Sequence, residues 1–315
     1  MTRFWAGLGL LVLCGCPVDG GGGGVGGGGG GGSGANFSKG FAFVRKDDRN
    51  LYVADQSDYS NVSALTTSSG VHQPSLSADG KKVVYVVQGS NGAGEIDVVS
   101  SSGGTPSTVL STATQTAITN LRDPVLSPDG SKVVFGCDQG GGSALAVVNS
   151  DGTMFSILAA SQTYSSPSFY PDGNSVLAAA GSSLGTLTSI EKVTVATGAT
   201  QSLTGSLGNE AQTIANRVVI SPDGTHAAFD GRLGSGATRI FTIDLANPNS
   251  INHLTDYPAD PNANDTFPCW QGNGTVAFSS DTGGNDQVYT VSSTASLSTG
   301  TLVLPSAIEP WFGPN

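Results

Sequence analysis

Three histidines are the side chains of this sequence best suited to proton transfer or metal binding. They are His72, His226 and His253. A repeat described below assigns them to the start of an innermost strand, to a second strand and to an outer strand, so we do not expect them to meet. Zinc needs three or four ligands within about 2 Å of one point. The histidines therefore predict no metal site, and we expect no cofactor.

The segment from Gly181 to Gly185 reads Gly-Ser-Ser-Leu-Gly and matches the G-x-S-x-G pattern of α/β-hydrolases. In those enzymes the serine lies on a sharp turn between a strand and a helix, and an acid and a histidine follow it in the chain. Here the match falls in a loop between two expected strands of a chain rich in Gly and Ser. We therefore predict that the protein is not an enzyme.

Acidic residues gather in two loops near the C-terminus. One contains Asp256, Asp260 and Asp265, and the other runs from Asp281 to Asp286. Calcium takes six to eight oxygen ligands in one shell, and the spacing matches no EF-hand loop. The sequence leaves open whether these loops bind calcium, and we predict no metal site.

Aspartate also recurs in a repeated turn that organises the chain. The turns lie at intervals of 43 to 51 residues: Ser77–Gly80, Ser127–Gly130, Tyr170–Gly173, Ser221–Gly224 and Gln271–Gly274. Pro presets φ in such a turn, Asp or Asn tolerates its unusual backbone regions, and Gly takes the positive φ that closes a tight hairpin. The aspartates are thus explained as turn formers, and each turn is expected to join two strands.

Each repeat contains four short runs with the period of two that is typical of β-strands. Units of 40 to 50 residues with four strands are typical of the blades of a β-propeller. We count six units, and the segment from Glu309 to Phe312 supplies the innermost strand of the unit whose other strands lie within residues 37–70. The sequence therefore predicts an all-β, six-bladed propeller over residues 37–315, closed by pairing of its N- and C-terminal strands.

The repeat resembles that of the TolB-type, WD40-like propellers, with the pattern P-x-W/F-S-P-D-G-K-K-I-A-F. The best copies start at Pro124, which reads Pro-Val-Leu-Ser-Pro-Asp-Gly-Ser-Lys-Val-Val-Phe, and at Ser280, which reads Ser-Asp-Thr-Gly-Gly-Asn-Asp-Gln-Val-Tyr. The resemblance covers residues 37–315 and implies a module that binds other molecules on a propeller face.

The residues just before each innermost apolar run should gather at one mouth of the central channel. Their mixture of charged, amide and aromatic groups is typical of a recognition surface. Alternatively they pair with one another, Arg122 or Arg217 with Asp123 or Glu309. The predicted binding residues are His72, Gln73, Arg122, Asp123, Asn216, Arg217, Phe267 and Glu309.

The N-terminus has the pattern of an exported lipoprotein. Arg3 precedes an apolar run that ends at Leu13-Cys14-Gly15-Cys16, which resembles the bacterial lipobox. Cys14 is an alternative site, but Leu13 before it is bulkier than the small residue that such a site prefers. We predict a signal peptide over residues 1–15, lipidation of Cys16, and a flexible Gly-rich linker that completes residues 16–36. In lipoproteins an Asp after the lipidated cysteine often causes retention in the inner membrane, and Pro17 stands at that position here. The resemblance therefore implies a location in the outer membrane, facing the periplasm or the exterior.

The formal net charge of −11, with only 13 Lys and Arg, excludes nucleic acid as a partner. Our main hypothesis is a monomeric, non-catalytic envelope lipoprotein that binds a protein or peptide partner and is held at the membrane by its lipid. Two alternatives stay open: a periplasmic polysaccharide lyase or hydrolase acting at the channel mouth, and a carbohydrate-binding module.

Overall fold

The described part of the computed structural model comprises residues 36–315, except 68, 206 and 208–210. The expected signal peptide, Cys16 and nearly all of the linker lie outside these residues. Within the described part, the regular structure is β-strand apart from two short 3₁₀ turns, η1 (Ser90–Gly92) and η2 (Thr282–Gly284). No helix in this part is long and apolar enough to cross a membrane.

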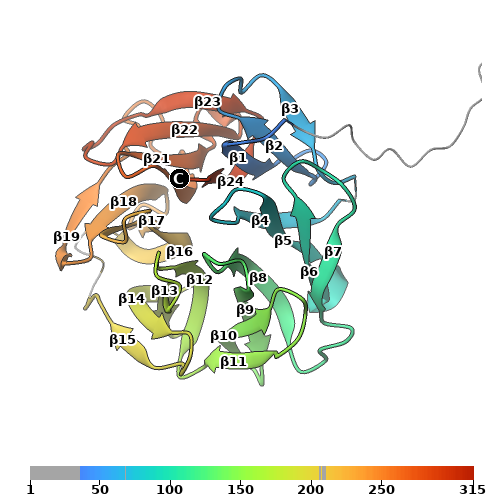
Figure 1. Ribbon diagram of the computed structural model, residues 1–315. Helices are drawn as coiled ribbons and strands as arrows, with labels where there is room; N and C mark the ends of the chain where they lie inside the picture. Colours follow the sequence, from blue (N-terminus) through green and yellow to red (C-terminus); the bar gives the residue numbers. More distant parts are fainter. Residues whose placement is uncertain (1–35, 68, 206, 208–210) are drawn as a thin grey trace, which may run out of the picture. The chain divides into compact units, whose positions relative to one another are not determined.

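The strands form antiparallel sheets that radiate from a common centre, which is a propeller arrangement (Figure 1). Four sheets have four strands each. Their orders are β24 (Ile308–Gly313), β1 (Gly40–Val44), β2 (Leu51–Asp55), β3 (Val62–Ala64); β4 (Val71–Leu76), β5 (Lys82–Gln88), β6 (Gly94–Ser100), β7 (Ser107–Ser111); β8 (Thr119–Leu126), β9 (Lys132–Gln139), β10 (Gly142–Asn149), β11 (Ser156–Ala159); and β20 (Asp265–Gln271), β21 (Thr275–Ser280), β22 (Gln287–Ser292), β23 (Thr301–Pro305).

The fifth sheet has eight strands, which differs from the separate four-stranded units expected from the repeat. Its two halves meet at one pair of residues, Leu187 of β14 and Ile214 of β16. The strands are β12 (Thr163–Phe169), β13 (Ser175–Gly181), β14 (Leu187–Thr194), β15 (Thr200–Ser202), β16 (Ala211–Ile220), β17 (His226–Leu233), β18 (Thr238–Asp244) and β19 (Asn247–His253).

The two ends of the described chain share one sheet. β24 pairs antiparallel with β1, and Gly40 lies opposite Gly313 while Phe41 lies opposite Phe312. Both phenylalanines are at most 1% exposed, and their rings meet edge to face with centroids 5.0 Å apart. The predicted pairing of the terminal strands is therefore present.

The five repeated turns each join two strands, as predicted: β4 to β5, β8 to β9, β12 to β13, β16 to β17 and β20 to β21. Between β8 and β9, the Gly130 N–H donates to Ser127 O at 2.8 Å, and Ser127 Oγ donates to Asp129 at 2.6 Å. Gly130 has a φ of 69°, which a residue with a Cβ rarely adopts. In the last turn Gly272, and not Gly274, has the positive φ.

Neighbouring sheets pack face to face through apolar side chains. One such cluster combines Val84 and Ile96 of one sheet with Leu121 and Phe135 of the next. All four are at most 2% exposed. Each sheet therefore buries its faces only against its neighbours, as the sequence repeat required.

Candidate functional site

The predicted binding residues lie on the innermost strands, which surround the central channel, just before the apolar end of each strand. Five of the six central positions have a left-handed backbone, with φ between 49° and 53°. Beside each of these five, the register of pairing with the second strand of the sheet shifts. We name the six the inner ring. They are Gln73, Asp123, Ser166, Arg217, Phe267 and Glu309, of which Arg217 lacks the positive φ.

Side chains of the inner ring bind the backbone of the next sheet. The Gln73 N–H donates to Glu309 Oε2, and the Asp123 N–H donates to Gln73 Oε1 at 3.1 Å. The Ser166 N–H donates in turn to Asp123 Oδ2 at 3.2 Å, and the Val218 N–H donates to Ser166 Oγ at 2.8 Å. This relay links the innermost strands of successive sheets and fixes their positions around the channel.

Two residues outside the predicted set complete the relay. Asp230 of β17 is fully buried and accepts the N–H groups of Arg217 at 2.8 Å and Phe267 at 3.0 Å. Ser279 of β21 accepts the Glu309 N–H at 2.9 Å. The sequence repeat could have revealed both residues, because each is polar at a position where the other four repeats have an apolar residue or Gly. Those four residues are Val44, Val86, Gly136 and Ala179.

Arg217 extends across the channel from β16. Its guanidinium lies 5.1 Å from the ring centre of Phe267 and 5.2 Å from that of Trp311, and it donates to Pro310 O at 2.7 Å. Burial lowers the pKa of Arg217, while the charges of Asp123 and other nearby groups oppose this shift. The side chain thus fills the channel centre and ties β16 to β24.

The predicted charged residues find partners other than those expected. Arg122 pairs with Asp138 at 2.9 Å, and no ion pair within 4 Å joins Arg122 or Arg217 to Asp123 or Glu309 among the described residues. Glu309 instead accepts from Arg49 at 3.1 Å. Burial acts to raise the pKa of Glu309, but hydrogen bonds from His72 and the Gln73 N–H outweigh it and hold the pKa below its usual value.

Little free space remains at this end of the channel. A cavity of about 10 Å³ lies among Gln73, Asp123, Ser166 and Arg217, enough for about one water molecule. Asp123 is 7% exposed, and its Oδ1 has no hydrogen-bond partner. Burial raises the pKa of the Asp123 carboxyl against the charge of Arg217. As a binding surface, the inner ring stays a prediction.

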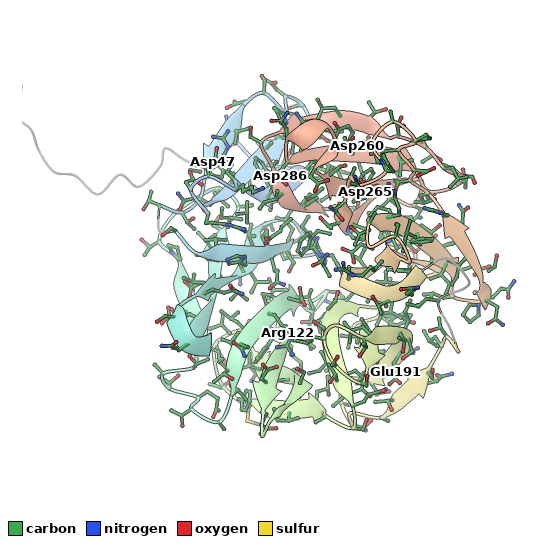
Figure 2. All side chains as sticks on the ribbon, turned by 180° about the vertical axis from the view of Figure 1, so that it is seen from behind. Asp47, Arg122, Glu191, Asp260, Asp265 and Asp286 are labelled. Carbon is green, nitrogen blue, oxygen red and sulfur yellow. The ribbon has the colours of Figure 1, made fainter. Side chains whose placement is uncertain are left out.

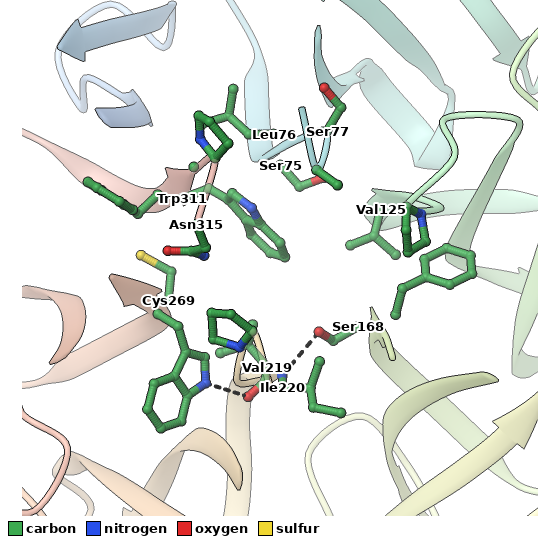
Figure 3. A pocket seen from close by; sticks show the side chains of 18 of the residues that line it. Ser75, Leu76, Ser77, Val125, Ser168, Val219, Ile220, Cys269, Trp311 and Asn315 are labelled. Atoms are coloured by element: carbon green, nitrogen blue, oxygen red, sulfur yellow. Dashed lines mark hydrogen bonds between the residues drawn. The ribbon is translucent and has the colours of Figure 1, made fainter. Parts of the chain in front are cut away.

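A larger cavity opens at the opposite end of the channel, beside the repeated turns. We name it the turn-side cavity; it has a volume of about 260 Å³, and no charged side chain lines it. Figure 3 shows Trp311 near its middle, with Ser168 and Cys269 at its sides. Trp311 also borders the small cavity of the inner ring, together with Ser75 and Val125.

The acidic loops lie around the sheet of β20 to β23, where Figure 2 labels Asp260, Asp265 and Asp286. Among the described residues, no group of three or more His, Cys, Asp or Glu is placed to hold a metal ion. Asp265 is fully buried and accepts from Thr255 Oγ1 at 2.6 Å, while its Oδ1 lacks a partner. Burial raises the pKa of Asp265 to about 6.

The G-x-S-x-G match does not form a nucleophile elbow. Gly181 ends β13, and Leu187 begins β14, so the intervening loop joins two strands of one sheet. Ser183 Oγ shares a hydrogen bond of 2.8 Å with Thr186 Oγ1. The strand-turn-helix geometry that exposes such a serine is missing from this loop.

These features define a β-propeller whose channel is closed in its middle. The fold is that of TolB-like propellers. The chain is similar to TolB from Acinetobacter baumannii, with a TM-score of 0.66 and 17% identity over 89% of this chain and 68% of that one. It is also similar to a putative TolB from Agrobacterium tumefaciens, with a TM-score of 0.58 and 18% identity over 86% of this chain and 91% of that one.

Other solved propellers with different roles share the fold. A chain of a nidogen/laminin complex matches with a TM-score of 0.65 at 10% identity, over 87% of this chain and 98% of that one. An oligogalacturonate lyase in complex with manganese matches with a TM-score of 0.53 at 15% identity, over 80% of this chain and 73% of that one. No family model and no curated protein sequence matches the chain. At these identities the likeness shows the fold alone.

Proposed function

We propose that this chain is a non-catalytic lipoprotein of the cell envelope whose six-bladed propeller binds a protein or peptide partner. The blade count treats the eight-stranded sheet as two blades, because only the pair of Leu187 and Ile214 joins its halves. With this division, the sheet of β24 and β1 is the blade that closes the ring. Pairing of the terminal strands also covers edges that could otherwise recruit other chains.

The turn-side cavity is the observation that carries the proposal. Its lining combines aromatic and aliphatic side chains with a few hydroxyl groups, which is the composition of binding pockets. Acid–base catalysis requires a titratable group within hydrogen-bond reach of the substrate. The titratable side chain in the lining is the Cys269 thiol, and burial raises its pKa to about 12. The cavity therefore favours binding over catalysis.

The lipid anchor and the location in the outer membrane form part of this proposal. They rest on the segment around Cys16 and on Pro17. A tether rich in glycine would let the propeller reach a partner some distance from the membrane.

Photo-crosslinking in intact cells tests partner binding and locates it. A crosslinking amino acid replaces Ala78 beside the turn-side cavity, His72 beside the inner ring, or Met154 on an outer turn, where the side chain is 80% exposed. We expect one discrete adduct with a protein or peptide from Ala78 and none from Met154. An adduct from His72 alone would place binding at the inner ring, and no adduct from either channel position would contradict the proposal.

A further inference from the structure

The rim of the turn-side cavity is built by the repeated turns. The second residue of four of the five turns, and Pro314 near the C-terminus, contribute apolar surface around the opening. These rim residues are Ala78, Pro128, Pro171, Pro222 and Pro314. The cavity of about 260 Å³ lies just below the range of about 300–1,000 Å³ that is typical of small-molecule sites. Its size suits one large apolar side chain inserted between rigid walls.

Ser168 gives the cavity a polar group with unused hydrogen-bonding capacity. The side chain is 4% exposed, and its Oγ accepts the Ile220 N–H at 3.1 Å (Figure 3). No hydrogen bond donated by this hydroxyl is found among the described residues. The other lining serines differ, because Ser75 donates to Pro124 O at 2.8 Å and Ser77 donates to Asp79 at 2.7 Å. A carbonyl of a bound peptide would satisfy the Ser168 hydroxyl.

Carboxylates stand immediately outside the apolar rim. Asp129, Asp172 and Asp223 each follow a rim proline, and all three are exposed. Asp79 has the same position, but Lys81 lies 3.7 Å from it and offsets its charge. Lys132 is close to Asp129 in the sequence, but its ammonium group donates to Asn149 at 3.3 Å instead. The three uncompensated aspartates therefore form a negative arc along one side of the opening.

We propose that the turn-side cavity binds a peptide segment in which one bulky apolar side chain is flanked by basic residues. The apolar side chain would fill the cavity above Trp311, a neighbouring carbonyl would accept from Ser168, and Lys or Arg would face the negative arc. An acidic segment would meet like charge at the rim, which costs affinity. This inference rests on the proposed function and narrows its partner class.

Three fluorescent peptides of equal length test the inference by titration. One carries Phe between pairs of Lys, one carries Phe between pairs of Glu, and one carries Ala between pairs of Lys. We expect the Phe/Lys peptide to bind at least about tenfold more tightly than the other two, and less tightly as salt increases. Replacing Ala78 by Trp should block its binding, because the indole would occupy the rim.

Matched variants separate the charge effect from changes in folding. The double variant Asp129→Asn/Asp223→Asn keeps one side-chain oxygen in each turn, which can still accept from Ser127 and Ser221. It should weaken binding of the Phe/Lys peptide about tenfold. The control is Asp58→Asn/Asp151→Asn, whose carboxylates cap Ser60 and Thr153 in exposed turns away from the cavity lining. This control should bind like the unaltered protein, and all variants should retain the original melting temperature.

The outcomes distinguish this inference from the proposed function. Equal binding of the Lys and Glu peptides, or no loss in Asp129→Asn/Asp223→Asn, would overturn the preference for basic segments. If no peptide binds while Ala78 still crosslinks a partner, the inference is wrong and the proposed function stands. If neither peptide binding nor a crosslink is found, both are wrong.

Discussion

At the scale of single residues, buried polar groups hold the channel together, and the repeat pattern predicts only some of them. The positions of Gln73, Asp123 and Glu309 at the channel could be predicted, because each precedes a Pro and an apolar run. Their partners could not, since side-chain direction at a left-handed residue depends on packing between sheets. Asp230 was missed for the same reason, although it stands where four of the other five repeats have apolar residues or Gly.

The first prediction concerns Arg217. Replacing it with Ala removes the donor to Pro310 O and the contacts with Phe267 and Trp311, and leaves the buried Asp230 with fewer compensating groups. We expect Arg217→Ala to lower the free energy of unfolding by about 3 kcal/mol in urea titrations. The exposed Arg232 offers a control, whose replacement should change the value by less than about 0.5 kcal/mol. Equal small effects would show that Arg217 does not stabilise the channel.

The second prediction concerns the buried Asp265. Because burial raises its pKa to about 6 in the folded chain, against about 4 when unfolded, the folded state binds the proton more tightly. The contribution of Asp265 to stability is therefore greatest below pH 4 and declines between pH 4 and pH 6, by an amount on the order of 3 kcal/mol. Asp265→Asn removes this titration.

Urea denaturation at several pH values checks the prediction for Asp265. The stability of Asp265→Asn relative to the unaltered protein should increase between pH 4 and pH 6 and then stay constant. Other carboxylates titrate alike in both proteins, so their contributions cancel in the comparison. A difference that does not vary with pH would show that Asp265 ionises normally.

At the scale of elements, the sequence defined the strands and the turns between them well. Period-two runs and Pro-Asp-Gly turns fix the hairpins locally, so β8 and β9 could be placed from residues 124–135 alone. The joining of two expected units into an eight-stranded sheet could not be foreseen. It depends on one backbone pairing between β14 and β16, Leu187 with Ile214, and a single pair of residues leaves no pattern in the sequence.

The third prediction concerns β24. Phe312 is 1% exposed and packs against Phe41, so Phe312→Ala should lower the free energy of unfolding by about 3–5 kcal/mol. Deleting residues 309–315 should cost more, because it also removes the strand that pairs with β1. Removal of Asn315 alone provides the control and should leave the melting temperature nearly unchanged. Equal melting of the two truncated proteins would exclude a stabilising role for β24.

At the scale of the whole molecule, the repeat predicted the propeller because each unit can bury its faces only against neighbours. The binding site of the propeller was harder to predict from the sequence than its fold. The predicted residues turned out to be extensively bonded to one another and to backbone groups, while the turn-side cavity is lined by ordinary core residues such as Leu76 and Ile220. Residue composition alone does not distinguish such a lining from the packed interface between two sheets.

The fourth prediction concerns the lipobox. Replacing Cys16 with Ser should remove the acylated residue and shift the protein from the membrane fraction to the soluble fraction, with the propeller still folded. Labelling with a radioactive fatty acid and fractionation of cells check this outcome. Cys14→Ser is the matched control and should stay labelled and membrane-bound. Labelling that persists in Cys16→Ser but disappears in Cys14→Ser would reassign the anchor to Cys14.

The pairing of β1 also determines how the domain would respond to mechanical load. A force applied to the chain ahead of residue 36 reaches the domain at β1, which is hydrogen-bonded to β24 on one side and to β2 on the other. A load carried by an edge strand such as β3 would oppose a single row of hydrogen bonds. Extracting β1 requires two rows to break together, so the domain can be pulled from its N-terminal side without its outer strands peeling away.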